Sequence, residues 1–353
     1  MIDTMKRVAV MLIAATSVPL LSFQAAYAIP EGTKVQTYES GLNFPVDMSW
    51  VPGTKKIFFT EKSGAIRVMV GRRLRGRPCR TLDVNSSGER GALGIALHPK
   101  FKRNKYLYVF YTKSSPLSHR VTRFKVKANR CTKPKHIVRG LNASSSGYHN
   151  GGQLAFSRGK LFVTTGEAHN PSFAQDTNSR QGKVLRINPN GSVPDGNPFG
   201  TNNPVWAYGL RNPFGLAVRG SNNRIYVTDN GASCDDELNL IKKSRNYGWG
   251  SGYQCGTRGV GPNPKGPLRR WGSIIVPTDP WWYEGSVKQL RRRLFVGDFD
   301  GRLHRIRLNR KGTKLRSDKV IHSAPNGIVD VSNGPGGRLY FMTPNTIYRI
   351  VPD

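Results

Sequence analysis

The chain contains the stretch Lys160-Leu161-Phe162-Val163, and this pattern decides the fold because it recurs along the sequence. In each copy a basic or glycine turn leads into Leu or Ile, an aromatic residue and further residues that favour β-strands. The six copies are Lys56-Ile57-Phe58-Phe59, Tyr106-Leu107-Tyr108-Val109, Lys160-Leu161-Phe162-Val163, Arg224-Ile225-Tyr226-Val227, Arg293-Leu294-Phe295-Val296 and Arg338-Leu339-Tyr340-Phe341. Most copies are followed by a polar turn and a second alternating strand, so the repeated unit is a β-hairpin.

Successive copies start 50, 54, 64, 69 and 45 residues apart, which is the length of a four-stranded blade with loop insertions. Six such units predict an all-β fold, a six-bladed β-propeller of four-stranded antiparallel blades, as a single domain over residues 29–353. A sandwich would need shorter and more even spacing, and no amphipathic helical pattern supports βαβ units. The longest insertions lie between the third and fifth copies, where we expect the functional site.

The N-terminal residues 1–28 resemble a secretory signal peptide. Lys6 and Arg7 precede an apolar run from Val8 to Phe23, and Ala26-Tyr27-Ala28 forms a small-x-small cleavage site. The alternative is a membrane anchor, although the run is short and no basic cluster follows it. Beyond this segment no stretch approaches the roughly 18 apolar residues of a transmembrane helix, so we expect an exported protein, periplasmic or secreted.

The four cysteines permit three disulfide pairings in an exported chain, and the sequence alone does not choose among them. Nearest-neighbour pairing, Cys79 with Cys131 and Cys234 with Cys255, is our prediction. Free buried thiols are the alternative. A zinc site is not expected because no Cys-x-x-Cys or paired histidine spacing occurs.

The composition is strongly basic, with 55 Lys and Arg against 21 Asp and Glu and a formal net charge of +34. Such a surface should adsorb to anionic polymers, including those of a cell envelope, through counterion release. No recognition helix or RRM signature accompanies the basic stretches, so we expect no specific nucleic-acid partner. The alternative is a general compositional bias without a partner.

Two sequence patches near the long insertions carry candidate chemistry. His149 lies between Tyr148 and Asn150-Gly151-Gly152, and a histidine at such a turn can act as a general base because its pKa lies near neutrality. In the stretch 209–215, Arg211 and Asn212 form a donor pair between glycines and a proline, suited to a carbonyl or carboxylate. Taken alone, each patch could equally be structural.

The third patch is acidic. Four carboxylates occur within nine residues from Asp229 to Glu237, in a chain that is otherwise basic. Clustered oxygen ligands suggest a hard cation, most plausibly Ca²⁺, with Asp235, Asp236 and Glu237 as candidate ligands. The alternative is a structural turn whose carboxylates pair with nearby Arg or Lys.

These motifs occur in an order that resembles the soluble glucose/sorbosone dehydrogenase family. That family consists of six-bladed propellers that use pyrroloquinoline quinone (PQQ) and Ca²⁺ to oxidise sugars. The resemblance covers roughly residues 38–350. It rests on residues 88–99 (GERGALGIALHP), the His149 turn, residues 182–188 (GKVLRIN), 209–215 (GLRNPFG), 235–241 (DDELNLI) and 246–249 (NYGW).

The resemblance implies a role for each matching residue. His149 matches the general base that acts on the sugar hydroxyl while hydride passes to the quinone. Arg211 and Asn212 match the residues that contact the quinone oxygens, and the backbone carbonyls of Gly231 and Ala232 match those that ligate Ca²⁺. Glu89 stands where family members can carry a glutamine beside the substrate, and we assign it to the cofactor site.

The sequence departs from the family where basic side chains of the last two blades contact the carboxylates of PQQ. Here it has Phe299-Asp300-Gly301 and residues 326–331 (NGIVDV), with Arg302 and Arg305 as possible substitutes. Three functions follow as hypotheses: a PQQ- and Ca²⁺-dependent sugar dehydrogenase with an unknown electron acceptor, a propeller of the same fold that binds carbohydrate or protein without turnover, and a binder of polyanions.

Overall fold

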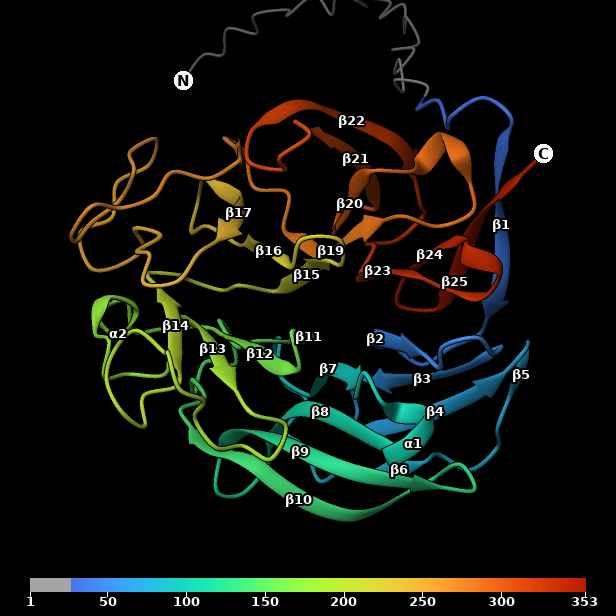
Figure 1. Cartoon of the computed structure of the whole chain (residues 1–353), viewed down its shortest axis with the longest axis horizontal. Helices are drawn as coiled ribbons and strands as arrows, with labels where there is room; N and C mark the ends of the chain where they lie inside the picture. The colour runs from blue at the N-terminus through green and yellow to red at the C-terminus, as the bar shows by residue number, and fades with distance from the viewer. Residues whose placement is uncertain (1–26) are drawn as a thin grey trace, which may run out of the picture.

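Six antiparallel sheets surround a common axis in the computed structural model of the chain, which describes residues 27–353 (Figure 1). Five sheets have four strands, and the first blade carries a short fifth strand. The predicted six-bladed β-propeller of four-stranded antiparallel blades is therefore confirmed. The predicted signal segment, residues 1–28, lies outside the described residues except for its last two. No helix within residues 27–353 is long and apolar enough to cross a membrane.

The blades follow one another along the chain, and each starts at the propeller axis. Blade one contains β2 (Pro45–Trp50), β3 (Lys56–Glu61), β4 (Ala65–Val70), β5 (Arg73–Leu74) and β6 (Arg80–Thr81), and blade two contains β7 (Ala92–Leu97), β8 (Tyr106–Lys113), β9 (Ser118–Lys127) and β10 (Arg130–Leu141). Blade three contains β11 (Gly151–Ser157), β12 (Lys160–Thr165), β13 (Lys183–Ile187) and β14 (Val205–Tyr208).

The second half of the chain repeats this arrangement. Blade four contains β15 (Gly215–Arg219), β16 (Arg224–Asp229), β17 (Asp236–Ile241) and β18 (Arg269–Trp271), and blade five contains β19 (Pro277–Tyr283), β20 (Arg293–Asp298), β21 (Arg302–Leu308) and β22 (Leu315–Ser323). Blade six contains β23 (Asp330–Asn333), β24 (Leu339–Met342), β25 (Thr346–Pro352) and β1 (Thr33–Ser40). Short helices are α1 (Phe101–Asn104), α2 (Ser172–Gln175) and the 3₁₀ turns Lys288–Leu290 and Pro335–Gly337.

The two ends of the described chain close the ring. Strand β1 pairs antiparallel with β25, so that Thr33 lies opposite Pro352 and Val35 opposite Ile350 (Figure 1). This pairing covers an edge that either strand would otherwise expose and ties the N-terminal residues to the last blade.

The six repeated cassettes form the second strand of each blade. Because each blade packs against its neighbours on both faces, both faces of that strand are covered. The aromatic residue of every copy is accordingly at most 5% exposed: Phe58, Tyr108, Phe162, Tyr226, Phe295 and Tyr340. The repeat that predicted the fold is thus the main packing element of its core.

Both predicted disulfides are present, Cys79 with Cys131 and Cys234 with Cys255. The first joins the end of blade one to β10 of blade two. The second joins the turn after β16 to the long insertion between β17 and β18, and so anchors that insertion beside the candidate site.

Three buried aspartates connect neighbouring blades at the axis: Asp47 on β2, Asp279 on β19 and Asp330 on β23. Each carboxylate accepts a backbone N–H from the innermost strand of a neighbouring blade. The bonds run from Ile95 N to Asp47 (2.6 Å), from Leu216 N to Asp279 (2.9 Å) and from Met48 N to Asp330 (2.9 Å). The innermost strands that carry these bonds surround the centre of Figure 1.

These axial carboxyls make the stability of the chain depend on pH. Burial, and after it the neighbouring Asp279, raises the pKa of Asp330 well above its ordinary value. A carboxyl whose pKa is higher in the folded than in the unfolded state stabilises the fold fully only below its unfolded pKa of about 4, and this contribution is lost as the pH rises. We therefore expect Asp330→Asn, which retains an acceptor oxygen for Met48 N, to unfold at a higher temperature than the unchanged chain at about pH 8.

The expected gain is at least about 1 kcal/mol at about pH 8 and close to zero at about pH 4, measured by thermal unfolding at both pH values. Asp195→Asn, on an exposed loop, is the matched control and should change neither value. Equal melting temperatures of Asp330→Asn and the unchanged chain at both pH values would show that the Asp330 carboxyl ionises without cost.

Candidate active site

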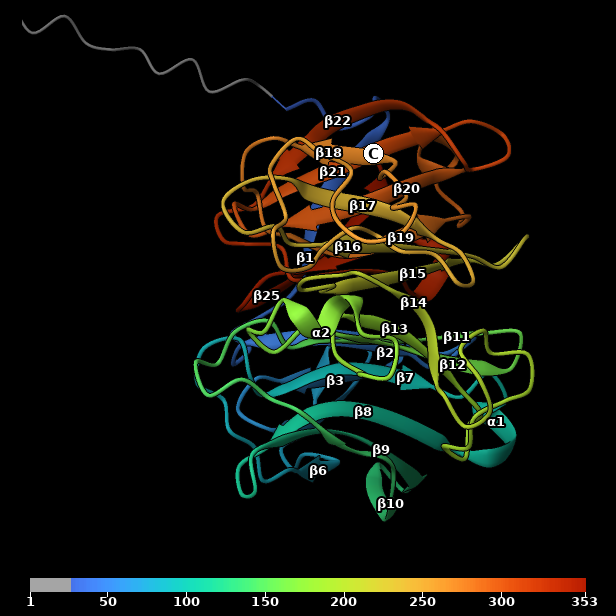
Figure 2. The same ribbon diagram turned by 90° about the vertical axis from the view of Figure 1, so that its left-hand side faces the viewer.

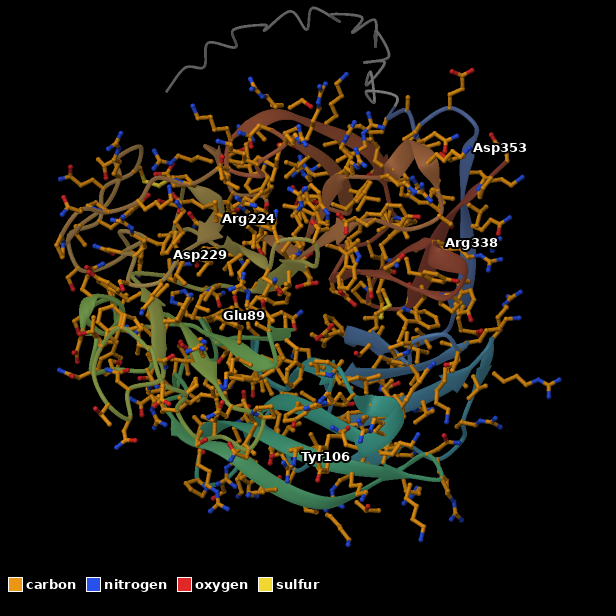
Figure 3. All side chains as sticks on the ribbon, in the orientation of Figure 1. Glu89, Tyr106, Arg224, Asp229, Arg338 and Asp353 are labelled. Atoms are coloured by element: carbon orange, nitrogen blue, oxygen red, sulfur yellow. A yellow bond between two sulfur atoms is a disulfide. The ribbon has the colours of Figure 1, made fainter. Side chains whose placement is uncertain are left out.

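The loops that enter the first strand and leave the second strand of a blade lie at the same end of that blade, because the strands are antiparallel. Residues 82–91, 142–150, 166–171, 209–214 and 230–235 are loops of this kind, and they meet on one face of the propeller. Hydrogen bonds join the predicted residues Glu89, His149 and Asn212, and they join Arg211 to the Gly231 turn. Glu89 and Asp229, labelled in Figure 3, mark the two halves of this region.

His149 is held in one orientation by two acids. Its Nδ1 lies 2.7 Å from Oε1 of Glu167, and its backbone N–H donates to Oε2 of Glu89 at 2.9 Å. With Glu167 ionised, the proton resides on Nδ1, and Nε2 remains free to accept a proton. Nε2 has no hydrogen-bond partner among residues 27–353. His149 thus has the geometry of a base positioned by a carboxylate.

The turn around His149 depends on glycine. His149 itself has a φ of 59°. A Cβ on Gly166 would lie 1.9 Å from the carbonyl oxygen of His149, so only glycine fits in the loop that follows β12. This close approach brings Glu167, the next residue, to the imidazole. Sequence reasoning missed Glu167, although its place directly after the strand of the third cassette was a usable signal.

Asn212 and Glu89 connect two blades. Nδ2 of Asn212 donates to Oε2 of Glu89 at 3.0 Å, and its Oδ1 accepts from Gly151 N at 3.0 Å. Because the same Glu89 oxygen accepts the His149 backbone N–H, one carboxylate fixes both predicted site residues. Asn212 is 2% exposed, so its amide is oriented before any ligand arrives.

Arg211 lies across the metal-binding turn suggested by the sequence. Its Nη1 donates to the carbonyls of Asn230 at 3.1 Å and Gly231 at 2.6 Å, and its guanidinium lies 5.2 Å from the ring centroid of Trp249. The backbone N–H of Arg211 donates to the carboxylate of Asp229 at 3.0 Å. Burial raises the pKa of Asp229 to about 8. Sequence reasoning included Asp229 in the acidic patch but did not single it out.

The acidic run 235–237, which the sequence predicts to supply metal ligands, makes hydrogen bonds within the protein. Asp236 accepts from Gly231 N at 2.8 Å through one oxygen and from the backbone of Ile275 and Val276 through the other. Asp235 accepts from the Tyr253 hydroxyl at 2.8 Å, and Glu237 accepts from Asn239 at 3.0 Å and pairs with Arg270 at 3.5 Å. These carboxylates shape the turn and hold the insertion, and Asp235, Asp236 and Glu237 stay predicted metal ligands. The carbonyls of Gly231 and Ala232 remain candidates.

The geometry and the sequence agree with one known family. The profile described as Glucose / Sorbosone dehydrogenase matches residues 42–351. The chain belongs to this family. The chain is 28% identical over 354 residues to the aldose sugar dehydrogenase YliI of Escherichia coli, with 92% of this chain and 94% of that protein covered. It is 31% identical over 283 residues to quinoprotein glucose dehydrogenase B of Acinetobacter calcoaceticus, with 68% and 57% covered.

A solved structure supports the same assignment. The PQQ-bound aldose sugar dehydrogenase of Streptomyces coelicolor superposes with a TM-score of 0.79 at 27% identity, covering 92% of this chain and 99% of that one. Membership in a family of sugar dehydrogenases supports an oxidoreductase function for this chain.

Several buried polar atoms of the chain have no hydrogen-bond partner, and they indicate where a polar ligand would bind. Three lie in the loops described above, Nε of Arg211, Oδ1 of Asn230 and Oδ1 of Asn150, and a fourth, Nε1 of Trp249, lies in the insertion beside Arg211. A buried donor or acceptor without a partner costs about 1–3 kcal/mol of stability. A polar ligand that bonds to these clustered atoms would recover part of that cost. This side of the site therefore fits the quinone oxygens and the cation of the family's cofactor.

The opposite side of the site fits less well. Arg302, one possible substitute for the missing cations, is already paired with Asp298 at 2.7 Å and Asp300 at 2.5 Å. The other, Arg305, lies on β21, the third strand of its blade, opposite Phe295 and Lys319. Arg302 is therefore already engaged, and Arg305 lies within a strand and not in a loop at the site.

Proposed function

We propose that the chain is an exported, PQQ- and Ca²⁺-dependent dehydrogenase that oxidises a hydroxyl group of an aldose or oligosaccharide. The observation that carries this proposal is the His149–Glu167 pair, joined through Glu89 to Asn212 and, by the adjacent residue, to Arg211. The names of the E. coli, Acinetobacter and Streptomyces relatives support the sugar substrate and the quinone cofactor.

The protein residues have separable roles in this reaction. His149 accepts the proton of the sugar hydroxyl at Nε2, and Glu167 stabilises the resulting imidazolium through Nδ1–H. Arg211 and Asn212 would hold the quinone oxygens, and the positive charge of Arg211 favours negative charge that develops there. When bound, PQQ supplies the acceptor for the hydride of the sugar carbon. An external electron acceptor would then reoxidise the cofactor.

The calcium proposal rests on the carbonyls of the turn after Asp229. The Gly231 carbonyl accepts from Nη1 of Arg211 at 2.6 Å, so Ca²⁺ at this turn would share that oxygen with the guanidinium or take it over. We expect Ca²⁺ at about 100 times its Kd to raise the free energy of unfolding by about 2.7 kcal/mol, reversed by excess chelator. The measurement is thermal unfolding with Ca²⁺ or with chelator, together with elemental analysis. Identical melting curves and a metal-free protein would contradict the proposal.

Titration of PQQ into the purified protein in the presence of Ca²⁺ tests the proposed function most directly. Calorimetry should show one saturable site at micromolar or lower concentration, and the loaded protein should reduce an artificial electron acceptor when aldoses are added. Absence of saturable binding at micromolar PQQ would remove the enzyme proposal.

The second candidate function is a propeller that binds carbohydrate without turnover. The observation that favours it is the ion pairing of Arg302 with Asp298 and Asp300, which leaves the carboxylates of PQQ without the family's basic partners. Losing two charge-assisted contacts at about 1.5–3 kcal/mol each would weaken cofactor binding by about two to four powers of ten. Saturable sugar binding without any PQQ binding would establish this second function.

A further inference from the structure

In one pocket outside the candidate active site, every charged lining residue is a cation. It lies in the insertion between β17 and β18, residues 242–268, which forms the golden loops at the left edge of Figure 1. The cavity measures about 440 Å³. Four of its lining residues are cationic: Lys242, Arg245, Arg258 and Lys265.

No carboxylate lines this pocket, and none of its four cations has an ion-pair partner within 4.0 Å among residues 27–353. Lys265 is half-buried, whereas the other three side chains reach solvent. Burial, and after it Lys242, Arg245 and Arg258, lowers the pKa of Lys265. The cations therefore repel one another in a partly desolvated place, where such repulsion is screened less than on open surface.

Backbone hydrogen bonds order the loop that carries these charges. Lys265 N donates to the carbonyl of Asn246 at 2.8 Å, and Nδ2 of Asn246 donates to the carbonyl of Val260 at 2.8 Å. Val260 N in turn donates to Gly248 O at 2.8 Å. Pro264 also lines the pocket and limits the backbone next to Lys265. These bonds fix the main chain beside Lys265, and the exposed side chains of Lys242, Arg245 and Arg258 line the same pocket, where a bound anion would offset their repulsion.

We propose that this pocket binds a polyvalent oxyanion that carries phosphate groups. The charge count decides against a single carboxylate, because one negative charge would leave most of the four cations uncompensated. Arg245 and Arg258 offer planar donor pairs that match phosphate oxygens, and the two lysines supply compact charge. The phosphate groups can belong to a short free anion or to a phosphate-bearing polymer, which share this chemistry.

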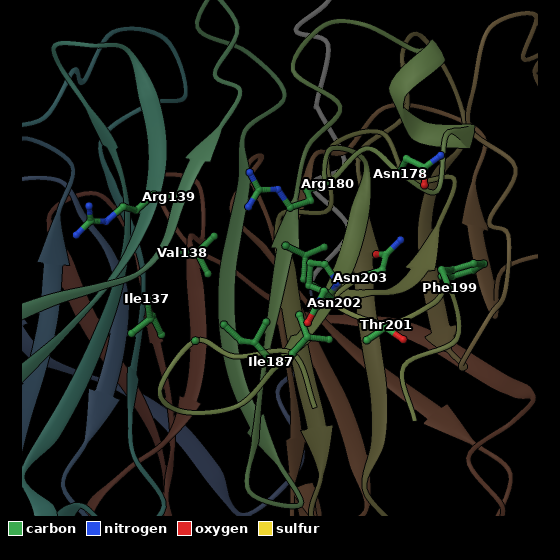
Figure 4. Close-up of a pocket in the computed structure, with 14 residues that line it drawn as sticks. Ile137, Val138, Arg139, Asn178, Arg180, Ile187, Phe199, Thr201, Asn202 and Asn203 are labelled. Carbon is green, nitrogen blue, oxygen red and sulfur yellow. The ribbon is translucent and has the colours of Figure 1, made fainter. Parts of the chain in front are cut away.

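A second pocket of similar volume has fewer cationic lining residues and serves as a comparison. It measures about 470 Å³ and lies between β10 and residues 191–204, where Arg139 and Arg180 are its cationic residues (Figure 4). Arg180 donates to the carbonyl of Gly140 at 3.1 Å, and the rest of the lining is uncharged. This second pocket has two cations, and Arg180 already donates to a backbone carbonyl, so we do not expect it to bind a polyvalent anion.

The test is calorimetric titration of the full chain with inorganic pyrophosphate at constant ionic strength. We expect saturable binding that the triple variant Lys242→Gln, Arg245→Gln, Arg258→Gln weakens at least tenfold. The matched control is Arg72→Gln, Arg73→Gln, Arg75→Gln, which removes the same charge from an exposed hairpin and should change the Kd less than twofold. All six side chains are exposed, so the fold should persist in both variants, as thermal unfolding can verify.

Long-chain polyphosphate distinguishes the two sources of phosphate. If the ligand is a polymer, the Kd for polyphosphate should be much lower than the Kd for pyrophosphate. The pocket variant should still lose more affinity than the control variant. A free anion predicts similar Kd values per site. The proposal would be overturned if both variants lost affinity equally, or if the unchanged chain showed no saturable pyrophosphate binding. Any binding would then be due to the overall positive charge.

Discussion

Replacing His149 with glutamine is expected to lower the kcat of sugar oxidation by about 1,000-fold while changing the Kd for PQQ by less than about threefold. Glutamine resembles the imidazole in size and can still hydrogen-bond to Glu167, but it cannot accept a proton at the position of Nε2. The measurement pairs steady-state turnover of the PQQ-loaded protein with calorimetric PQQ titration, since a base acts on the reaction rather than on holding the cofactor.

Two companion variants make this result specific. Glu167→Gln should lower kcat by about 100-fold and alter its pH profile, because an amide no longer favours the tautomer with the proton on Nδ1. His98→Gln places the same substitution at the far end of β7, away from the candidate site, and should leave kcat and Kd unchanged. Full turnover by His149→Gln would show that another residue is the base.

Replacing Arg211 with lysine is expected to lower kcat/KM by about 100-fold and to weaken PQQ binding by about tenfold or more. Lysine preserves the charge but not the planar set of donors, so it cannot contact the Gly231 carbonyl and the quinone oxygens together. Both losses should appear, because Arg211 holds the cofactor in the ground state and stabilises charge that develops during its reduction. Kinetics and PQQ titration of the same preparation separate the two.

Arg186→Lys is the matched control for Arg211→Lys. The guanidinium of Arg186 lies 5.0 Å from the ring centroid of Trp206, much as that of Arg211 lies 5.2 Å from Trp249, but Arg186 is on β13 outside the candidate site. It should leave kcat/KM and PQQ binding unchanged. If both variants behaved alike, the effect would belong to the loss of arginine–tryptophan packing and not to the quinone contact.

The architecture was predictable because propeller blades are local. Each cassette pairs with strands that neighbour it in sequence, and each recurs with the same apolar and aromatic pattern, so the repeat reports the blade without knowledge of distant contacts. The resemblance to the sugar dehydrogenases, and not the repeat, assigned His149 and Arg211 to one site, and the structure has their loops on one face of the ring. Nearest-neighbour pairing of the cysteines held for the same reason, because each bridge spans one blade or one blade junction.

Only the tertiary structure determined the contacts between blades, because the residues that form them are far apart in sequence. Asn212 reaches Glu89 across 123 positions, and Met48 reaches Asp330 across 282 positions. Glu167 became the partner of His149 because Gly166 lets two loops approach, and Asp236 accepts three backbone N–H groups where the sequence suggested a metal ligand. Composition fixed which charges the chain carries, but their energies depend on burial and on the nearest partner, and these exist only after the six blades have closed around the axis.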